Sequence, residues 1–424
     1  MYRKFKLINK LAVFGIIALC GKQANAQFSL SGEIRPRAEF RNGFKTLNTL
    51  TSAPALFVEQ RTRLNFGYVK DKLSFKVALQ DVRTWGNTAQ IYKTDPSLIN
   101  LFEAYGEYQF NKKFAMKIGR QELNYDNERF LGVLDWAQQG RSHDLAKFTY
   151  KDSLGFSAHA GFAFNQNIGA EPTKLNSTFY NGTANYKTMQ YIWLHKDYKS
   201  GKFSFLFLND GRQKIDSTTA FKQTFGLYAE QTINAWKLHE EAYYQTGKTT
   251  ASKNVSAYLL SFSAALPKVF AAPELGFDYL SGTKSTSTKE NAFDPAFGTN
   301  HKFYGLMDYF YVGNGFGQGG RTTGLIDVYL NAKLKTGKKS LVLLNIHQFN
   351  TPVDVFSGTT KLSSSLGQEL DAVYNLNIYQ SVSLKIGYSQ LFSTKTLEAI
   401  KGITNQKGPN QWAWTMLTFS PTFI

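Results

Sequence analysis

Arginine is the residue type whose number and spacing in this sequence most clearly suggest chemistry. Eleven arginines follow the first 26 residues, and nine of them lie between positions 35 and 141. In the segments 33–39 and 59–63, every odd-numbered position is Glu or Arg. A guanidinium group offers planar, permanently charged donors that fit carboxylates and phosphates. The pattern therefore indicates either a site for anions or a set of ion pairs.

Two interpretations of this arginine cluster remain open at the level of sequence. In the first, opposite charges on facing strands form ion pairs that stabilise a sheet modestly. In the second, the arginines surround a water-filled constriction, since rings of Arg or Lys select anions and a low-dielectric wall concentrates them. Intermingled Glu and Asp would then keep anion binding weak enough for release.

Histidine is the other candidate for chemistry, and the sequence holds six. His143-Asp144 resembles a general base with an orienting carboxylate, but a serine nucleophile also needs oxyanion donors, and no G-x-S-x-G elbow occurs. Ser157 and His159 lack an acidic neighbour, and the segment 239–241 (HEE) lacks the second histidine of a zinc motif. We expect no enzyme, no catalytic residue, no metal and no cofactor.

The first 26 residues have the pattern of a secretory signal peptide. A basic start precedes the apolar segment 11–19, which is shorter than the roughly 20 residues of a transmembrane helix. The segment 24–26 (ANA) fits a small-x-small cleavage site. We therefore expect the mature chain to begin at Gln27. A lipoprotein anchored at Cys20 is the alternative, but the residue before that cysteine is a bulky leucine.

Composition limits the class of protein. The chain has 424 residues, of which 15% are aromatic, and a net charge of +18. Removal of the signal peptide leaves 44 basic and 31 acidic residues, a net charge of +13, and no cysteine. The aromatic content excludes disorder, and the missing cysteine excludes a small disulfide-stapled fold. No later apolar stretch approaches 18 residues, which excludes helical membrane spans.

Apolar and polar residues alternate along most of the mature chain. In 28–41 and 57–69, one face is apolar and the other carries the charged residues, as in a strand with one oily and one wet side. Eighteen such strands can be placed. They are at about 28–41, 57–69, 72–84, 101–110, 114–120, 143–150, 154–163, 186–196, 202–211, 220–231, 236–246, 254–264, 272–280, 321–334, 340–350, 367–378, 381–392 and 411–422.

The connections between these strands alternate between short, such as 69–71, and long, such as 121–142 and 281–320. Outer-membrane barrels alternate in this way because every second turn faces the periplasm. The sequence therefore predicts an all-β fold for residues 27–424: a transmembrane antiparallel up-and-down β-barrel with long extracellular loops and short periplasmic turns.

The number of strands depends on one segment. Residues 303–311 (FYGLMDYFY) could form a nineteenth strand, but bacterial single-chain barrels have an even number. We therefore assign this segment to the extracellular loop 281–320 and predict eighteen strands, with sixteen as the alternative. Barrels of about 16–18 strands leave an aqueous lumen.

The charged face of the strands is expected to be the lumen, because a charge facing lipid costs about 2–4 kcal/mol at the midplane. The residues expected to line one inner wall are Glu33, Arg35, Arg37, Glu39, Glu59, Arg61 and Arg63, extended by Asp81, Arg83, Glu103 and Glu107.

Two further features resemble ligand sites but have simpler explanations. The segment 313–320 (GNGFGQGG) lacks the Lys-Ser/Thr tail of a phosphate-binding loop, and we expect a flexible extracellular loop there. The positive charge occurs without a nucleic-acid-binding motif, so we expect no nucleic-acid partner. Scattered lysines suit contact with outer-membrane lipid and anionic lipopolysaccharide, or solubility of the loops.

Four segments of the first third resemble the alginate export porin family: 34–40 (IRPRAEF), 60–68 (QRTRLNFGY), 80–86 (QDVRTWG) and 119–144 (GRQELNYDNERFLGVLDWAQQGRSHD). The rest of the chain is similar mainly in strand rhythm. The resemblance implies an eighteen-stranded outer-membrane barrel whose narrow, arginine-rich pore passes an anionic polysaccharide or sugar-like solute. It implies a pore lined by Arg35, Arg37, Arg61, Arg63, Arg83, Arg120, Arg129 and Arg141, with Glu33, Glu59, Asp81, Glu103 and Asp144.

The resemblance also implies that loop 121–142 folds toward the lumen, where Gly132 and Gly140 permit tight bends. One departure concerns the periplasmic plug that such exporters can carry between the third-last and second-last strands. Here only Tyr379-Gln380 connects them, so an ordinary anion porin is an alternative to a gated polymer exporter with periplasmic export components as partners. The 40-residue loop 281–320 suggests another class, a non-conducting barrel that serves as a surface anchor or receptor.

Overall fold

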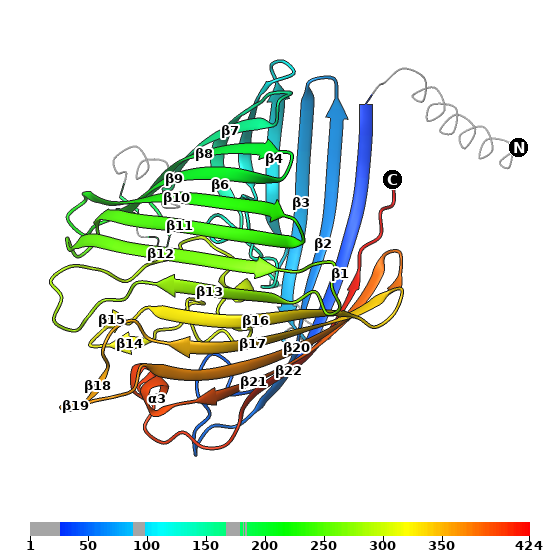
Figure 1. The fold of residues 1–424 in the computed structure, drawn as a ribbon. Coiled ribbons are helices and arrows are strands. Elements are labelled where there is room, and N and C mark those ends of the chain that lie inside the picture. Colours follow the sequence, from blue (N-terminus) through cyan, green and yellow to red (C-terminus); the bar gives the residue numbers. More distant parts are fainter. Residues whose placement is uncertain (1–25, 88–97, 167–178, 181, 183–184) are drawn as a thin grey trace, which may run out of the picture.

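The computed structural model describes residues 26–87, 98–166, 179–180, 182 and 185–424 (Figure 1). Eighteen antiparallel strands each pair with the next, and β22 pairs with β1, so the sheet closes into a barrel. The strands are β1 Ala26–Asn42, β2 Ala55–Lys70, β3 Leu73–Thr84, β4 Asn100–Gln109, β5 Phe114–Gln121, β6 His143–Lys151, β7 Phe156–Phe164, β8 Thr188–Tyr198, β9 Gly201–Gln213, β10 Thr219–Ile233, β11 Trp236–Lys248, β12 Asn254–Ala265, β13 Glu274–Leu280, β16 Leu325–Lys335, β17 Ser340–Asn350, β20 Ser365–Tyr379, β21 Val382–Ser393 and β22 Asn410–Phe419.

The predicted barrel and its strand number are confirmed. The expected signal peptide, residues 1–26, lies outside the described residues except for Ala26, which begins β1. No helix in the described part of the chain is long and apolar enough to cross a membrane.

The alternation of side chains sets the two faces of the wall, as the sequence predicts. Ile34 is 47% exposed on the outside of β1, whereas its neighbour Arg35 is buried inside. Outward Phe, Leu and Ile side chains continue around the barrel, and they form the apolar band that faces lipid. The inner face therefore carries the polar groups that can contact a solute.

The two ends of the barrel differ in the length of their connections. At the end where β1 begins and β22 ends, most turns are short; we call it the short-turn end (Figure 1). The opposite, long-loop end carries α3 (Lys395–Lys401) and two small hairpins, β14–β15 (Gly317–Gln318, Arg321–Thr322) and β18–β19 (Phe356–Ser357, Thr360–Lys361).

One of two expectations about loops needs correction. The connections 214–218 and 249–253 belong to the long-loop end but have only five residues each, because they close as tight turns with Ser217 and Ser252 at positive φ. The glycine-rich segment 313–320, expected to be a flexible extracellular loop, lies at the long-loop end and contains Gly317–Gln318, which pairs in the hairpin β14–β15.

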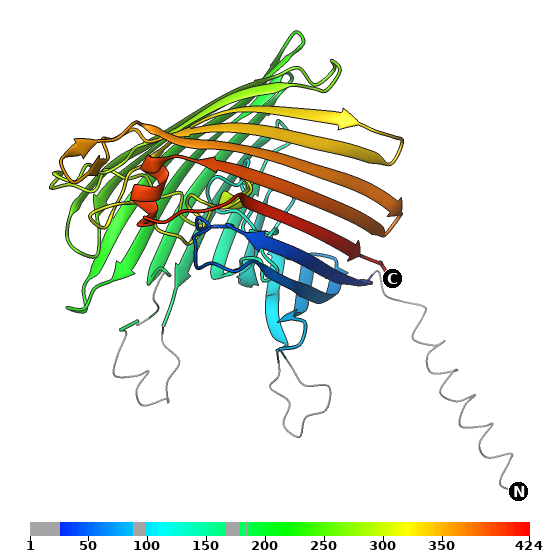
Figure 2. The same cartoon turned by 90° about the horizontal axis from the view of Figure 1, so that it is seen from below.

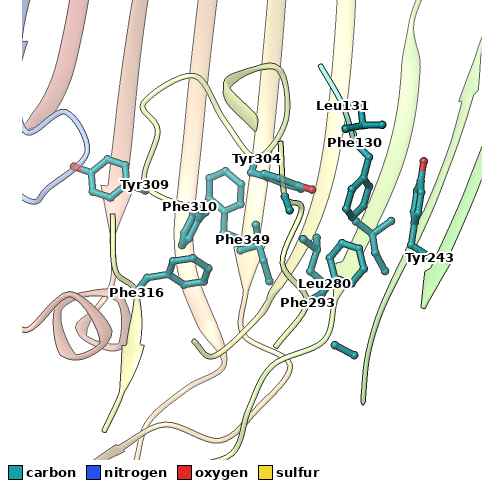
Figure 3. Close-up of a cluster of buried hydrophobic side chains, with 14 of the residues drawn as sticks. Phe130, Leu131, Tyr243, Leu280, Phe293, Tyr304, Tyr309, Phe310, Phe316 and Phe349 are labelled. Carbon is teal, nitrogen blue, oxygen red and sulfur yellow. The ribbon is translucent and has the colours of Figure 1, made fainter. Parts of the chain in front are cut away.

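Loops 122–142 and 281–316 fold into the barrel (Figure 2), where many of their apolar side chains are buried. Their aromatic side chains pack against each other and against the inner wall (Figure 3): Phe130 contacts Tyr243 of β11 and Phe293, and Phe310 contacts Phe349 of β17. Residues 303–311 belong to this packed loop and add no strand to the barrel, as predicted. The inward loops therefore decide where a solute could pass.

Candidate functional site

Loop 122–142 crosses the barrel interior and is held at both sides by arginines. At the first side, Asp135 forms ion pairs with Arg35 of β1 (Nη1–Oδ2, 3.2 Å) and with Arg61 of β2 (Nη2–Oδ1, 2.9 Å). The side chains of both arginines are at most 5% exposed. Arg61 also pairs with Glu33 at 2.6 Å. The pairing holds the loop against the wall of β1 and β2.

Electrostatics favours the charged form of Asp135. Its side chain is 63% exposed. The partial loss of solvation would by itself raise the pKa of the carboxyl group, but Arg35 and Arg61 outweigh it and hold the pKa below its usual value. The loop is therefore attached most firmly when this carboxyl group is ionised.

Arg37 and Gln138 also hold the loop at this side. Together with Arg35, Arg61 and Asp135, they form the attachment that we call the Asp135 anchor. Arg37 donates to the carbonyl oxygen of Trp136 at 2.6 Å, and its guanidinium lies 4.1 Å from the Trp136 ring centre. Gln138 accepts from Arg35 Nε at 3.1 Å. These arginines are therefore occupied by the loop and by neighbouring carboxylates such as Glu59.

At the opposite wall, Arg129 makes the second attachment, the Arg129 anchor. Its side chain is 1% exposed and donates to both carboxylate oxygens of Asp278 of β13, at 2.9 and 3.0 Å. It also donates to Tyr304 Oη at 2.9 Å and lies 3.4 Å from Glu241 of β11. Because such a pair is buried and bidentate, loss of the arginine would leave charged partners uncompensated.

Between the anchors, smaller contacts hold the loop along the wall of β7 to β9. Tyr125 Oη lies 2.9 Å from Tyr191 Oη. Asp126 accepts from Ser204 Oγ at 2.6 Å and from Trp193 Nε1 at 3.1 Å. The resemblance-based expectation that this loop folds toward the lumen agrees with these contacts.

The strand pleat divides the thirteen residues expected to line the pore into two groups. On the inner face or on loop 122–142 lie Glu33, Arg35, Arg37, Glu59, Arg61, Arg63, Glu103, Arg129 and Arg141. The other four, Asp81, Arg83, Arg120 and Asp144, have the parity of the outward rows of their strands. Asp81 and Arg83 need correction for this reason, whereas Arg120 and Asp144 stand at the rim and line a hollow there.

The register gives the reason for this correction. Asp81 faces Thr62, the residue between the inward Arg61 and Arg63, and has the same parity as the outward Phe75. Asp81 forms an ion pair with Arg83 at 2.6 Å. These charges sit at the long-loop end of β3, where a charge on the outer face costs only about 0–1 kcal/mol.

Arg120 and Asp144 form the second-last pair of β5 and β6 before loop 122–142, and they form an ion pair at 2.9 Å. They continue the outward row of Ile118 and Phe148, which are 50% and 44% exposed. Because β5 and β6 end here, the two side chains stand at the rim of the wall and border a hollow there.

Among the described residues, two of the expected arginines have no carboxylate within 4 Å. Arg63 donates to Gln80 Oε1 at 2.6 Å and lies 3.5 Å from the Phe102 ring centre. Arg141 donates to the backbone carbonyls of Phe297 and Gly298. Burial lowers the pKa of Arg141 to about 10, so it keeps its charge at neutral pH. These two cations are the best placed to attract a mobile anion.

Each of these two arginines lines a different hollow. Arg141 lies in a hollow of about 510 Å³ at the long-loop end, with Arg120, Arg212 and Asp294; we call it the outer hollow. Arg63 lies in a hollow of about 380 Å³ toward the short-turn end, with Lys76, Glu33, Glu103 and Glu122; we call it the inner hollow. Both hollows are polar and large enough for a small hydrated solute.

Gly140 lies between the two hollows. It has φ of +63°, and a Cβ built there would lie 2.7 Å from Arg63 Nη2 and 2.9 Å from the Phe102 ring. Glycine is therefore required both by the backbone conformation and by the close contact. Because Gly140 touches Arg63 and Arg141 follows it directly in the chain, the Gly140 segment links the two arginines.

Several inward cations and loop partners were missed by sequence reasoning. Lys76, Lys117 and Lys147 lie on the inner face of β3, β5 and β6, and Arg212 lies on the inner face of β9. The alternation with outward Phe75, Ile118 and Phe148 could have identified the three lysines. Asp135 and Gln138 carried no such signal, because a loop has no period that shows where its side chains point.

The histidines have structural partners. His143 Nδ1 lies 2.9 Å from Tyr186 Oη, and His159 Nδ1 lies 3.0 Å from Tyr125 Oη. Within the described ranges, no group of three or more His, Cys, Asp or Glu residues could hold a metal ion.

Comparisons with known proteins agree with this architecture. A family model described as alginate export matches residues 26–407. Similar solved structures include OpdQ of Pseudomonas aeruginosa, with a TM-score of 0.63, 11% identity, and 94% of this chain and 98% of that chain covered. OccAB4 of Acinetobacter baumannii has a TM-score of 0.62, 11% identity, and coverage of 95% and 100%. OpdK of Pseudomonas aeruginosa with vanillate has a TM-score of 0.59 and 10% identity, with 94% of this chain and 99% of that chain covered. At such identities the likeness shows the fold alone. No curated protein matches the sequence.

Proposed function

The chain belongs to the alginate export family and forms an outer-membrane β-barrel channel, and from this premise we propose that it passes anionic, sugar-like solutes past Arg141 and Arg63. The observation that carries the proposal is that these two inward cations have no carboxylate partner among the described residues and flank Gly140 from opposite hollows. A cation that no carboxylate contacts directly, in a low-dielectric wall, can attract a mobile anion.

Other features of the inner wall support a weak, transient hold on the solute. In the outer hollow, Arg212 is already paired with Asp210, and Arg120 with Asp144. In the inner hollow, Lys76 is paired with Glu103. Such neighbours moderate the attraction, and conduction requires that an anion can leave as well as enter. Of the fold's solved examples, OpdK was crystallised with vanillate, a small carboxylate.

The position of loop 122–142 bears on the size of the solute. Both anchors fasten the loop across the interior, and β20 and β21 are joined by Gln380 and Ser381 alone, which leaves no plug there. We propose that small uronate-like solutes pass with the loop in place, whereas a polysaccharide requires the loop to leave the lumen. Outer-membrane lipid and lipopolysaccharide are the proposed partners of the outer face, and periplasmic export components those of the short-turn end.

A surface anchor or receptor is less well supported. That alternative rested on loop 281–320 as an exposed extracellular surface, yet Tyr304, Met307 and Phe310 of this loop are at most 1% exposed inside the barrel. A catalytic role has equally little support, because the hydrogen-bond partner of His143 is the buried Tyr186 and not a serine, threonine or cysteine. We therefore propose a channel without enzymatic activity.

The proposal predicts that Arg141→Gln lowers the ratio of anion to cation permeability about three- to tenfold, the effect of losing roughly 1 kcal/mol of attraction. The measurement is the reversal potential in a planar bilayer under a salt gradient, followed by current block with glucuronate. Arg63→Gln is expected to act in the same direction, because it removes the corresponding charge of the inner hollow.

Arg321→Gln is the matched control. Among the residues that the structure describes, Arg321 also donates only to backbone carbonyls, those of Lys284 and Ser287, but it lines neither hollow. The control should keep the wild-type ratio. A cation-selective wild type, or an unchanged ratio in both test variants, would contradict the proposal.

A further inference from the structure

A third cavity lies on the wall opposite the arginines of β1 and β2 and takes no part in the proposed anion route. It has a volume of about 320 Å³ and lies between loop segments 127–129 and 302–306 and the inner faces of β10 to β17. We propose that this cavity, the β10–β17 pocket, binds a neutral saccharide unit.

The pocket is reached from the short-turn end. Lys237, near the start of β11, and Glu274, the first residue of β13, both line it and stand beside short turns. Loop residues Arg129 and Tyr304 close its other side, and both are at most 1% exposed. A ligand would therefore enter from the periplasmic side, since short turns of such barrels face the periplasm.

Aromatic rings form flat walls suited to the apolar faces of a sugar ring. Tyr329 of β16 lies opposite Gly276 of β13, and a Cβ at Gly276 would overlap the Tyr329 ring. The glycine thus lets the ring lie flat across the sheet, with its other face toward the pocket. Phe303 and Tyr228 also line the pocket. Concave sites with aromatic walls and a few convergent polar groups are typical for small organic ligands.

The polar groups in the pocket match hydroxyl groups. Asn331 and Asn345 face each other across β16 and β17, and Glu274 accepts from Ser263 Oγ at 2.7 Å and from Asn331 Nδ2 at 3.3 Å. The Asn345 amide and the Tyr329 hydroxyl have no hydrogen-bond partner among the residues that the structure describes. An amide offers both donors and acceptors, and so does a hydroxyl, which is what neighbouring sugar hydroxyls require.

The balance of charge selects a neutral ligand. Most charged groups of the pocket are paired with each other: Arg129 with Asp278, Lys237 with Glu230, and His347 with Asp327. His239, which also lines the pocket, is paired with Glu241. The remaining two, Lys302 and Glu274, have opposite signs. Lys302 donates to the backbone carbonyl of Asn127, but the four Asp and Glu side chains that line the pocket outnumber its three Lys and Arg side chains. The pocket therefore has no excess positive charge for a carboxylate, which distinguishes it from the outer hollow.

The size of the pocket limits the ligand. About 320 Å³ lies at the lower end of the volumes of small-molecule sites, which suits about one or two sugar rings. The proposal therefore concerns a monosaccharide, a disaccharide or the end of a longer glycan, held at the periplasmic side of loop 122–142.

The test measures binding of named neutral sugars to the full barrel in lipid nanodiscs. Glucose, mannose, galactose and cellobiose are titrated by saturation-transfer NMR, with glucuronate and open-chain sorbitol as comparison ligands. We expect saturable binding of at least one neutral sugar. Asn345→Ala and Tyr329→Phe should each weaken this binding about tenfold, the effect of one lost hydrogen bond.

Variants of the anion route separate this proposal from the proposed function. Arg141→Gln should leave sugar binding unchanged, and Asn345→Ala should leave the anion-to-cation permeability ratio unchanged. Thermal unfolding of each variant shows whether the barrel is intact. Absence of saturable binding of all four neutral sugars, tighter binding of glucuronate, or full binding in both pocket variants would overturn the proposal.

Discussion

Replacing Arg129 with Met is expected to release loop 122–142 from its far wall and to raise the single-channel conductance several times. The physical reason is the burial of the Arg129 anchor. Its guanidinium is 1% exposed and supplies the positive charge for Asp278 and Glu241, which are equally buried. Removal of one partner from a buried ion pair costs about 3–5 kcal/mol, because the other charge remains without compensation. Detachment of the loop lets water reach these carboxylates.

Planar-bilayer conductance and hydrogen exchange of residues 122–142 measure this effect together. A double variant, Arg129→Met with Asp278→Asn, should restore part of the wild-type behaviour, since it also removes a carboxylate that lost its partner. The control for loss of one positive charge is Arg321→Met, because Arg321 belongs to neither anchor. If Arg129→Met changes neither conductance nor exchange, the loop is held by its apolar contacts and not by this anchor.

Release of the other end of the loop is the second large effect, and it depends on pH. The pKa of Asp135 lies below its usual value because Arg35 and Arg61 outweigh burial. A carboxyl group with a lowered folded-state pKa stabilises the folded state above its unfolded-state pKa, about 3.9 for Asp. That contribution is lost as the pH falls through the folded-state pKa. The wild-type conductance should therefore be constant from neutral pH to about pH 4 and rise below it.

Asp135→Asn should show the raised conductance already at neutral pH, because the amide leaves the buried Arg35 without a carboxylate and Arg61 with Glu33 alone. The control is Asp354→Asn, which removes a carboxylate from the exposed Asp354–Lys361 pair of the hairpin β18–β19. It should leave conductance unchanged. A wild-type conductance that stays constant down to about pH 2, or a silent Asp135→Asn variant, would show that this anchor does not hold the loop.

The strands could be predicted closely because their signal is local. The eighteen segments placed from the alternation of apolar and polar residues correspond one by one to the eighteen barrel strands, with ends that differ by a few residues. The same signal assigned Arg35 and Arg61 to the inner face and Ile34 to the outer face. The alternation also indicates the outer face for Asp81, because Asp81 and the outward Phe75 are both odd-numbered residues of the same strand. The assignment of Asp81 to the inner charges did not take this into account.

The site could be predicted only in part. Sequence reasoning brought the arginines of β1 and β2 to the lumen and, through family resemblance, brought loop 121–142 toward them. It did not distinguish the arginines that hold this loop from Arg63 and Arg141, which have no carboxylate partner. That distinction depends on Asp135, which lies 100 residues from Arg35 along the chain.

The sequence by itself determined the closed barrel, its lipid-facing band and the inner position of the charged row on β1 and β2, because a strand repeats every two residues and lipid excludes charge. The tertiary structure decided which charges stay available, where loops 122–142 and 281–316 fill the interior, and which hollows remain. These features arise from contacts between residues far apart in the chain, and their energies depend on burial and partner geometry that no local pattern encodes.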